Sequence, residues 1–285
     1  MKLGIGRLRR FLASLLLGDS MEDLKRKLST QVTRVNRLEV LFDELDALKS
    51  SREISQEMID EFIWWKSKNP LSEQPLVSVC IATYNRAKIL TERSIPSVLN
   101  QTYSHLELIV VGDRCTDETE ELVGRIDDPR LQFIRLEERG DYPDDPYLRW
   151  MVAGGQAMNQ AMAHSKGEFI THLDDDDEYV AERLEKLVEF AKTNQCDFVW
   201  HPFWYQDPDG EWEQNDSGTF THSYVTTSSV FYRSWFKRIE WDSESYRLRE
   251  PGDWNRFRRI KYINPVCMRF SEPLLRHYSE RAQSG

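Results

Sequence analysis

The most chemically distinctive feature of this sequence is a run of four aspartates at positions 174–177. The run follows segment 168–173, which contains Phe169, Ile170 and Leu173 and is expected to form a buried strand. Adjacent carboxylates repel one another strongly unless a cation neutralises them. Because Mg²⁺ and Mn²⁺ prefer carboxylate and phosphate oxygens as ligands, we expect a divalent metal ion here. The alternative is a solvated acidic turn before the next helix.

Two other expected strands are also followed by polar residues. Segment 76–82 is followed by Thr83, Tyr84 and Arg86, and segment 106–111 is followed by Asp113. In a sheet of parallel strands, ligands bind beyond the carboxyl ends of the strands. We therefore expect these side chains and the aspartates to line one pocket.

From residue 75 onward, short apolar segments alternate with segments of helical periodicity. Strands are expected at 76–82, 106–111, 131–136 and 168–173, and helices at 88–100, 117–126, 155–165 and 181–194. Such alternation is typical of an α/β fold in which helices cover both faces of a mostly parallel sheet. The sequence contains no internal repeat.

Four of these segments, taken in order, resemble the inverting family-2 glycosyltransferases. They are VSVCIATYNR at 77–86, VVGD at 110–113, GEFI at 167–170 and LDDDD at 173–177. The resemblance covers nearly all of residues 75–205. It implies a GT-A (Rossmann-like) fold, a nucleotide-sugar donor, and Mn²⁺ or Mg²⁺ as the cofactor.

The resemblance also implies a role for each polar position. Thr83 and Tyr84 lie against the nucleotide base, and Asp113 accepts a hydrogen bond from it. Asp174 and Asp176 match the two acids of the family's DxD motif. The implied donor contacts are Thr83, Tyr84, Arg86, Asp113 and Asp174, and the implied metal ligands are Asp176, Asp177 and, from a closing segment at 273–278, His277. The chain departs from the usual family pattern at Ala82, Gly112, Arg114 and Cys115.

A second carboxylate site is expected in segment 250–257, which resembles the family's acid-Asp-Trp segment at a helix start. The resemblance implies that Asp253 is the catalytic base, which removes the proton from the acceptor hydroxyl. Aspartate is also a common helix cap, and the two roles are compatible. Beside it, Trp254 is the candidate for stacking on a sugar ring, although large aromatic side chains also fill cores.

The first 74 residues have a different pattern and are expected to form a helical extension and linker. Segment 24–48 carries an apolar stripe at heptad-like spacing, which packs either on the catalytic domain or on a second copy or partner. Segment 6–17 combines arginines with leucines and suits either an anionic membrane surface or burial against the neighbouring helix. A further helix is expected at 55–68, and two prolines then mark a linker before the domain at 75–285.

The composition argues against several classes of protein. A net charge of −10 is unsuited to nucleic-acid binding, which usually requires a basic surface. No apolar segment approaches the roughly 20 residues that span a bilayer. The four cysteines are widely spaced, unlike those of a zinc site or a disulfide scaffold. We therefore expect a cytoplasmic protein, with peripheral contact to a membrane as a further option.

Together these features predict an inverting, metal-dependent glycosyltransferase of glycan or polysaccharide biosynthesis. It would move a sugar from a nucleotide diphosphate donor to the hydroxyl of a glycan or other acceptor. One alternative is a non-catalytic sugar-binding or scaffolding protein that assembles through its N-terminal helices. A less favoured alternative is a sugar-phosphate nucleotidyltransferase, a class that generally opens with a glycine-rich phosphate loop, whereas residues 82–86 contain no glycine.

Overall fold

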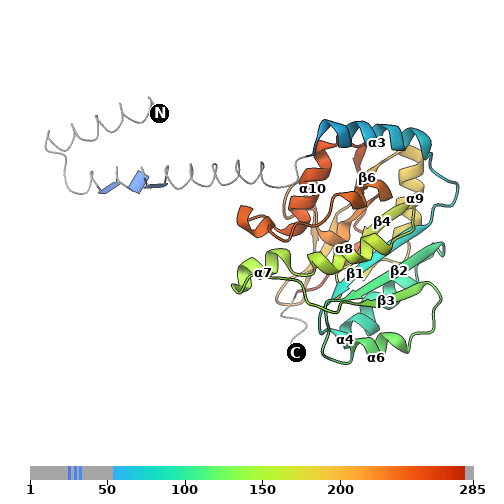
Figure 1. The fold of residues 1–285 in the computed structure, drawn as a ribbon, viewed down its shortest axis with the longest axis horizontal. Helices are drawn as coiled ribbons and strands as arrows, with labels where there is room; N and C mark the ends of the chain where they lie inside the picture. The colour runs from blue at the N-terminus through green and yellow to red at the C-terminus, as the bar shows by residue number, and fades with distance from the viewer. Residues whose placement is uncertain (1–24, 27–28, 31, 34–53, 280–285) are drawn as a thin grey trace. The chain divides into compact units, whose positions relative to one another are not determined.

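The computed structural model describes residues 25–26, 29–30, 32–33 and 54–279 (Figure 1). The predictions for segments 6–17 and 24–48 lie outside these residues, apart from the three short stretches before residue 34, which are helical and exposed. Residues Ile54–Gly285 form one compact unit. Among the described residues, no helix is long and apolar enough to cross a membrane.

A seven-stranded sheet forms the centre of the compact unit, with the strand order β10-β6-β9-β4-β1-β2-β3. Its strands are β1 (Val77–Thr83), β2 (Leu106–Gly112), β3 (Leu131–Arg135), β4 (Phe169–His172), β6 (Phe198–Trp200), β9 (Val230–Arg233) and β10 (Cys267–Arg269). β9 is antiparallel to its neighbours β4 and β6, while every other neighbouring pair in this sheet is parallel. The sheet is therefore mostly parallel, as the sequence pattern predicts.

Helices cover both faces of this sheet. Buried side chains of α3 (Gln56–Lys68), α8 (Gly155–His164) and α10 (Gly252–Tyr262) share one apolar core with Cys80 of β1. Those of α5 (Ile95–Leu99), α6 (Thr119–Gly124) and α9 (Arg183–Asn194) share the other core with Val79 and Ile81. Alternate residues of β1 thus enter opposite cores, which explains why the strand is apolar along its whole length.

The strands and helices predicted between residues 55 and 194 all form, with small shifts at their ends. The helix predicted at 88–100 forms as three consecutive pieces, which are α4 (Ala87–Ile89), the π-helical turn η1 (Leu90–Ser94) and α5. The elements that were not predicted include α7 (Pro146–Val152), the short 3₁₀ helices η2 (Thr227–Ser229), η3 (Ser234–Arg238) and η4 (Ser245–Leu248), and the strands β6, β9 and β10 of the central sheet.

A second sheet joins the end of the chain to the aspartate run. Its strands, in the order β5-β11-β7-β8, are β5 (Glu178–Tyr179), β11 (Leu275–His277), β7 (Phe203–Gln206) and β8 (Trp212–Asn215). β5 starts directly after the last aspartate and pairs with β11. This pairing brings His277 beside the aspartates from 100 positions further along the chain.

The helix α3 packs on the catalytic part of the chain. The Phe62 ring is buried, with its centroid 5.1 Å from that of Trp235 and 5.0 Å from that of Phe236. Lys66 Nζ lies 2.6 Å from a carboxylate oxygen of the buried Asp197. The predicted domain boundary at residue 75 stays a prediction, but the helix before it belongs to the same compact unit as the sheet.

Candidate active site

The carboxyl ends of β1, β2 and β4 open onto a cavity of about 830 Å³. Eight predicted site residues line it: Thr83, Tyr84, Arg86, Asp113, Asp174, Asp176, Asp253 and His277. The ninth, Asp177, is fully buried and contacts His277 from behind the cavity wall. The fold thus brings the predicted residues of both halves of the chain to one pocket.

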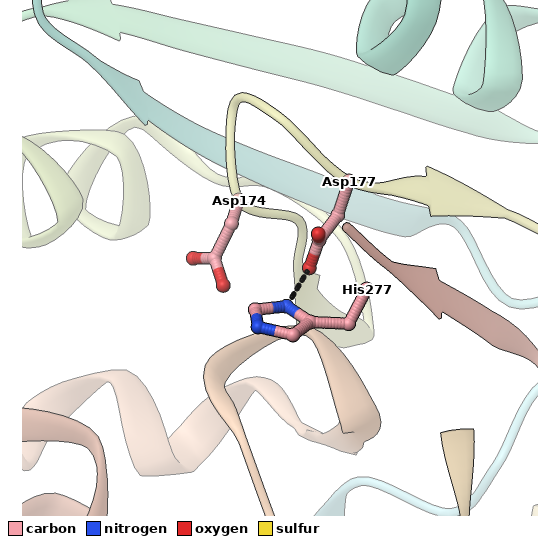
Figure 2. A group of neighbouring side chains, drawn as sticks. All are labelled: Asp174, Asp177 and His277. Carbon is pink, nitrogen blue, oxygen red and sulfur yellow. Dashed lines mark hydrogen bonds and ion pairs between the residues drawn. The ribbon is translucent and has the colours of Figure 1, made fainter. Parts of the chain in front are cut away.

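Asp174, Asp177 and His277 form a group in which one ligand atom of each residue lies within 4.8 Å of the others (Figure 2). Nδ1 of His277 lies 2.9 Å from Oδ2 of Asp177. The other oxygen of Asp177 accepts a hydrogen bond of 3.2 Å from the backbone N–H of Tyr278. The Asp176 carboxylate, predicted as a metal ligand, accepts a hydrogen bond from Arg86 instead of joining this group.

Burial and crowding change the pKa values of these groups. Burial raises the pKa of Asp174 well above its usual value, and the negative charges of Asp177 and Asp176 raise it further. Burial also raises the pKa of Asp175 to about 6, against an opposing effect of a nearby arginine. Burial alone would lower the pKa of His277, but the adjacent Asp177 carboxylate outweighs it and brings the value to about 9. A bound cation would relieve this excess of negative charge.

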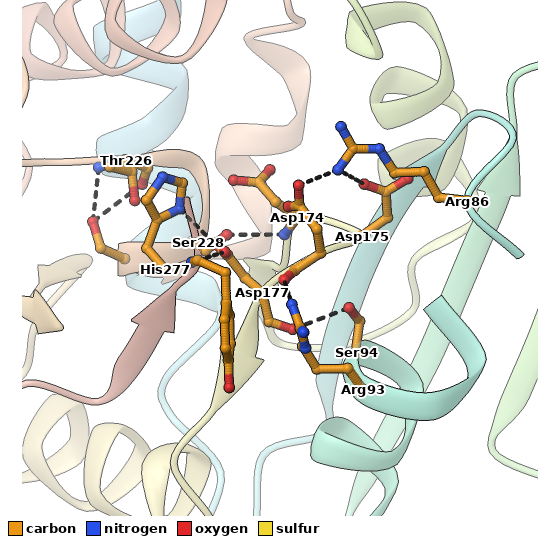
Figure 3. Close-up of polar contacts among 12 residues, drawn as sticks. Arg86, Arg93, Ser94, Asp174, Asp175, Asp177, Thr226, Ser228 and His277 are labelled. Atoms are coloured by element: carbon orange, nitrogen blue, oxygen red, sulfur yellow. Dashed lines mark hydrogen bonds and ion pairs between the residues drawn. The ribbon is translucent and has the colours of Figure 1, made fainter. Parts of the chain in front are cut away.

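Hydrogen bonds to the backbone hold the aspartate loop in place (Figure 3). Arg93 Nη1 donates to the carbonyl oxygen of Asp176 at 2.8 Å, and Ser94 Oγ donates to that of Asp177 at 3.0 Å. Both donors belong to the π-turn η1, a kind of turn that occurs frequently at functional sites. The N–H at the start of the loop donates to Oγ of Ser228 at 2.9 Å. The loop is therefore fixed from both sides before any ligand binds.

The residues predicted to contact the nucleotide base are covered by the loop that carries Arg139 and Tyr142. The guanidinium carbon of Arg139 lies over the ring of Tyr84, 3.5 Å from its centroid. Asp113 is only 2% exposed. One of its oxygens accepts from the Gly140 N–H at 3.1 Å, and the other accepts from the Tyr142 hydroxyl at 2.7 Å. A nucleotide base that pairs with Asp113 must therefore share or displace these contacts.

Asp253 is the second residue of α10, after Gly252. The cap position belongs to Pro251, and Oδ1 of Asp253 accepts a 2.6 Å hydrogen bond from the N–H of Trp254. Burial raises the pKa of Asp253, while the hydrogen bond from Trp254 lowers it. A half-buried carboxylate on a cavity wall, with a raised pKa, is well suited to accept a proton.

The sequence matches the family described as Glycosyl transferase family 2 over residues 78–143 and 147–262. The chain belongs to this family. Its matched segments contain every predicted site residue except His277. The predicted membership of this glycosyltransferase family is thereby confirmed, whereas the reaction and the role of each residue stay predictions.

Two curated relatives and one solved structure illustrate the likeness of this glycosyltransferase to known proteins. TuaG of Bacillus subtilis (strain 168), named for teichuronic acid biosynthesis, is 31% identical over 139 residues, which are 48% of this chain and 50% of TuaG. WfaP of Escherichia coli, named UDP-Glc:α-D-GlcNAc-diphosphoundecaprenol β-1,3-glucosyltransferase, is 29% identical over 131 residues, or 46% and 47% of the two chains. The chain thus matches about half of each relative.

S. aureus TarS 1–349, solved in complex with UDP-GlcNAc, matches this glycosyltransferase with a TM-score of 0.57 and 22% identity. The match covers 73% of this chain and 61% of TarS 1–349. At this identity the likeness speaks for the fold, and it confirms the GT-A class predicted from the sequence.

The aromatic side chains of the glycosyltransferase differ from the prediction in one respect. Trp254, the predicted stacking residue, is half-buried, with its ring centroid 5.8 Å from that of Phe220 and 5.9 Å from that of His222. Trp150, which sequence reasoning did not single out, lines the cavity and is 60% exposed. The cavity therefore has an accessible aromatic face on α7, outside the segment that the resemblance indicates.

Sequence reasoning also missed Arg93, Arg139 and Tyr142. Arg93 lies on what the sequence presents as an ordinary helix, where an arginine usually faces solvent. Arg139 and Tyr142 lie in a loop that has no periodicity, and their contacts with Tyr84 and Asp113 form only when the ends of β1 and β2 come together. The one local signal was the crowding of charges and prolines in segment 137–149.

Proposed function

We propose that this glycosyltransferase moves a sugar, with inversion, from a nucleotide diphosphate donor to a hydroxyl of a glycan acceptor, and that it depends on Mn²⁺ or Mg²⁺. The observation that carries the proposal is the assembly of the predicted donor, metal and base residues around one cavity. The names of TuaG and WfaP support a place in the biosynthesis of surface glycans or polysaccharides.

The residues around the aspartate loop fit a divalent cation. Asp174, Asp177 and His277 offer two carboxylates and an imidazole in one group. Burial, and then the charges of Asp177 and Asp176, raise the pKa of Asp174, and a cation bound beside it would offset both effects. We assign Asp174 and His277 to the metal, with Asp177 or Asp176 as the further protein ligand. A bound ion would neutralise the charge that gathers on the departing diphosphate.

The carboxylate of Asp253 supplies the other half of the chemistry. In the proposed reaction it takes the proton of the acceptor hydroxyl while the acceptor oxygen attacks the anomeric carbon. The bond from that carbon to the diphosphate oxygen breaks in the same displacement, so the configuration inverts and no covalent intermediate forms on the enzyme. The two carboxylate sites thus have separate duties, one toward the leaving group and one toward the acceptor.

The donor and the cellular setting are further parts of the proposal. UDP-GlcNAc in TarS and UDP-Glc in the name of WfaP make uridine diphosphate sugars the first donors to test. The lipid-linked acceptor in the name of WfaP supports a cytoplasmic enzyme that works against a membrane surface. We assign the first 53 residues a role in peripheral membrane contact or in self-association, through the arginine-rich and heptad segments.

The experiment measures release of nucleoside diphosphate by the full chain from UDP-Glc, UDP-GlcNAc, GDP-Man and a dTDP-sugar, with Mn²⁺ or with a chelator. We expect one donor class to be hydrolysed slowly in Mn²⁺ and not in the chelator. Asp174→Asn should abolish this turnover, whereas Asp127→Asn, at an exposed position outside the cavity, should not. Turnover that is equal in Mn²⁺ and chelator would contradict the metal assignment, and no release from any donor would contradict the proposal as a whole.

A further inference from the structure

The helix α7 lies at the edge of the compact unit (Figure 1), and two of its aromatic side chains are exposed. Tyr147 is 64% exposed and Trp150 is 60% exposed. Their ring centroids are 6.1 Å apart, and their planes meet at 20°, so the rings are stacked on each other. A single exposed aromatic residue needs no explanation, but a stacked pair of which one member lines the active-site cavity does.

The pair is held on a firmly anchored helix. The Asp145 carboxylate caps α7 by accepting hydrogen bonds of 2.9 and 3.0 Å from the N–H groups of Tyr147 and Leu148. Arg149 donates to two carbonyl oxygens of the preceding loop, at 3.0 and 2.8 Å. Met151, at the end of the helix, is buried. These contacts fix the direction in which the aromatic rings face before a ligand arrives.

The same helix is packed against the start of α10, which carries Asp253. A Cβ atom placed on Gly252 would lie 3.2 Å from the carbonyl oxygen of Met151, so the two backbones approach closely at this glycine. α7 also packs against η4, which precedes α10 in the chain. Trp150 and Asp253 line the same cavity. An acceptor whose hydroxyl reaches Asp253 therefore has its adjoining sugar rings near α7.

We propose that the face of Trp150 is a binding platform for a pyranose ring of the acceptor, with Tyr147 stacked behind it as support. The apolar C–H face of a pyranose packs well on an indole, whose flat surface gives a large contact area. The inference rests on the proposed function, because it gives the acceptor side of that reaction a second contact besides Asp253.

The charges around α7 favour a neutral sugar over a lipid surface as the occupant. The exposed carboxylates of Asp141, Asp144 and Asp145 lie within ten residues before Trp150 in the chain. Acidic side chains repel the anionic headgroups that attract peripheral proteins to membranes. Arg149, the basic residue of α7, has its guanidinium directed to backbone carbonyl oxygens. A neutral sugar carries no charge for these carboxylates to repel, and its hydroxyl groups can face them.

The test uses the full chain labelled with 5-fluorotryptophan and four variants: Trp150→Ala, Trp150→Phe, Tyr147→Ala and Trp64→Ala. Trp64 is the matched control, since it is 63% exposed on α3 and does not line the cavity. The probes are p-nitrophenyl glycosides of glucose, galactose and N-acetylglucosamine, followed by fluorine NMR. Disappearance of one resonance in the Trp150 variants identifies the signal to be followed.

We expect at least one glycoside to shift the Trp150 resonance in a saturable way. The Trp150 variants lack this resonance, so their binding of the same glycoside is measured by calorimetry: Trp150→Ala should weaken it roughly three- to tenfold, the usual worth of an aromatic stacking contact, whereas Trp150→Phe should retain most of it. Trp64→Ala should bind like the wild type. The proposal is overturned if no glycoside shifts the Trp150 signal, or if Trp150→Ala and Trp64→Ala bind equally well.

Two further measurements separate this inference from the proposed function. Binding of UDP by calorimetry in Mn²⁺ should be the same in Trp150→Ala and wild type, because the platform belongs to the acceptor. A loss of UDP affinity in that variant would assign Trp150 to the donor and overturn the inference while leaving the proposed function intact. A Trp150 shift caused by phosphatidylglycerol vesicles and by no glycoside would assign α7 to the membrane instead. Absence of donor turnover would contradict the proposed function and leave the glycoside result standing.

Discussion

At the scale of single residues, the site gives different environments to carboxylates of the same kind. Asp177 is fully buried, and its two oxygens are engaged by His277 and by a backbone N–H. Asp174 lies on the cavity wall with a pKa raised by burial and by its acidic neighbours. Asp253 lies on another element, and its carboxylate accepts the N–H that follows it in the chain. In the proposed reaction, these environments suit Asp177 to support, Asp174 to charge neutralisation and Asp253 to proton transfer.

Replacing Asp253 by Asn is expected to lower the single-turnover transfer rate roughly a hundredfold to ten-thousandfold, the usual contribution of a positioned general base. Donor affinity measured by calorimetry should stay the same, because Asp253 lies outside the metal group. The melting temperature should also stay the same, since Asn serves near a helix start as well as Asp does. Near-normal transfer by the folded variant would exclude Asp253. The neighbouring Glu250 would be a poor substitute, because Arg258 donates to both of its oxygens.

The acidic side of the pH–rate profile should report the same residue. Because burial raises the pKa of Asp253 above 3.8, the fraction of ionised base falls, and with it the transfer rate, at a higher pH than for an ordinary aspartate. The measurement is the transfer rate at saturating donor as the pH is lowered. Donor binding must be titrated in parallel, because Asp174 and Asp175 also have raised pKa values. An inflection at or below the usual aspartate value would contradict the role assigned to Asp253.

At the scale of helices and strands, the sequence predicts those elements that are determined by a local pattern of apolar residues. β1 and β2 are recognisable because both of their faces are buried, so nearly every residue is apolar. The strands β5 and β11 have only two and three residues, which is too few to show the alternating pattern of a strand. They are stabilised by pairing with each other. The resemblance indicated His277 as a site residue, but its place beside Asp177 follows from that long-range pairing. The π-turn η1 ends at Ser94, just before Pro96, and this proline, which has no N–H to donate, is the one local signal of a break in the helix predicted at 88–100.

The loop between β3 and α7 also makes contacts that no local sequence pattern reveals, and one of them allows a prediction. Its Tyr142 hydroxyl donates to Asp113, the residue expected to read the nucleotide base. Tyr142→Phe keeps the ring and frees one carboxylate oxygen, so UDP should bind more tightly. The expected gain is roughly three- to tenfold, since a hydrogen bond contributes about 1 kcal/mol. Calorimetry in Mn²⁺ measures it, with Tyr103→Phe as the control, because that hydroxyl donates to the Pro75 carbonyl outside the cavity. Weaker binding by Tyr142→Phe would show that the hydroxyl itself contacts the donor.

At the scale of the whole molecule, the chain divides at Glu53 into two units, and the site lies in the second. The helix α3 belongs to that second unit, although the sequence pattern groups it with the N-terminal extension. Phe62 is buried among aromatic rings, and Lys66 pairs with Asp197, a carboxylate that is almost fully buried. We therefore expect the linker prolines after α3 to separate two patterns of sequence rather than two independently folding bodies.

Two truncations test this boundary. Deleting residues 1–53 should leave the melting temperature and donor hydrolysis of the compact unit nearly unchanged, because the contacts of α3 stay in place. Deleting residues 1–68 removes the Phe62 side chain from its apolar pocket and leaves the Asp197 carboxylate without its ammonium partner. Burial of a phenylalanine contributes about 1.5–3 kcal/mol, and an unpaired buried charge adds to the loss, so a cost of about 3 kcal/mol or more is expected.

For a domain of this size, that cost corresponds to a fall in melting temperature of roughly 6 to 12 °C. Phe62→Ala in the full chain is the matched control, since it removes the apolar contact and keeps both the helix and the ion pair. It should lie between the wild type and the longer deletion, while Trp64→Ala, at an exposed position of the same helix, should melt like the wild type. Equal melting temperatures for the two truncations would place the boundary after α3, at the linker prolines, and would mean that the contacts of this helix with the core contribute no net stability.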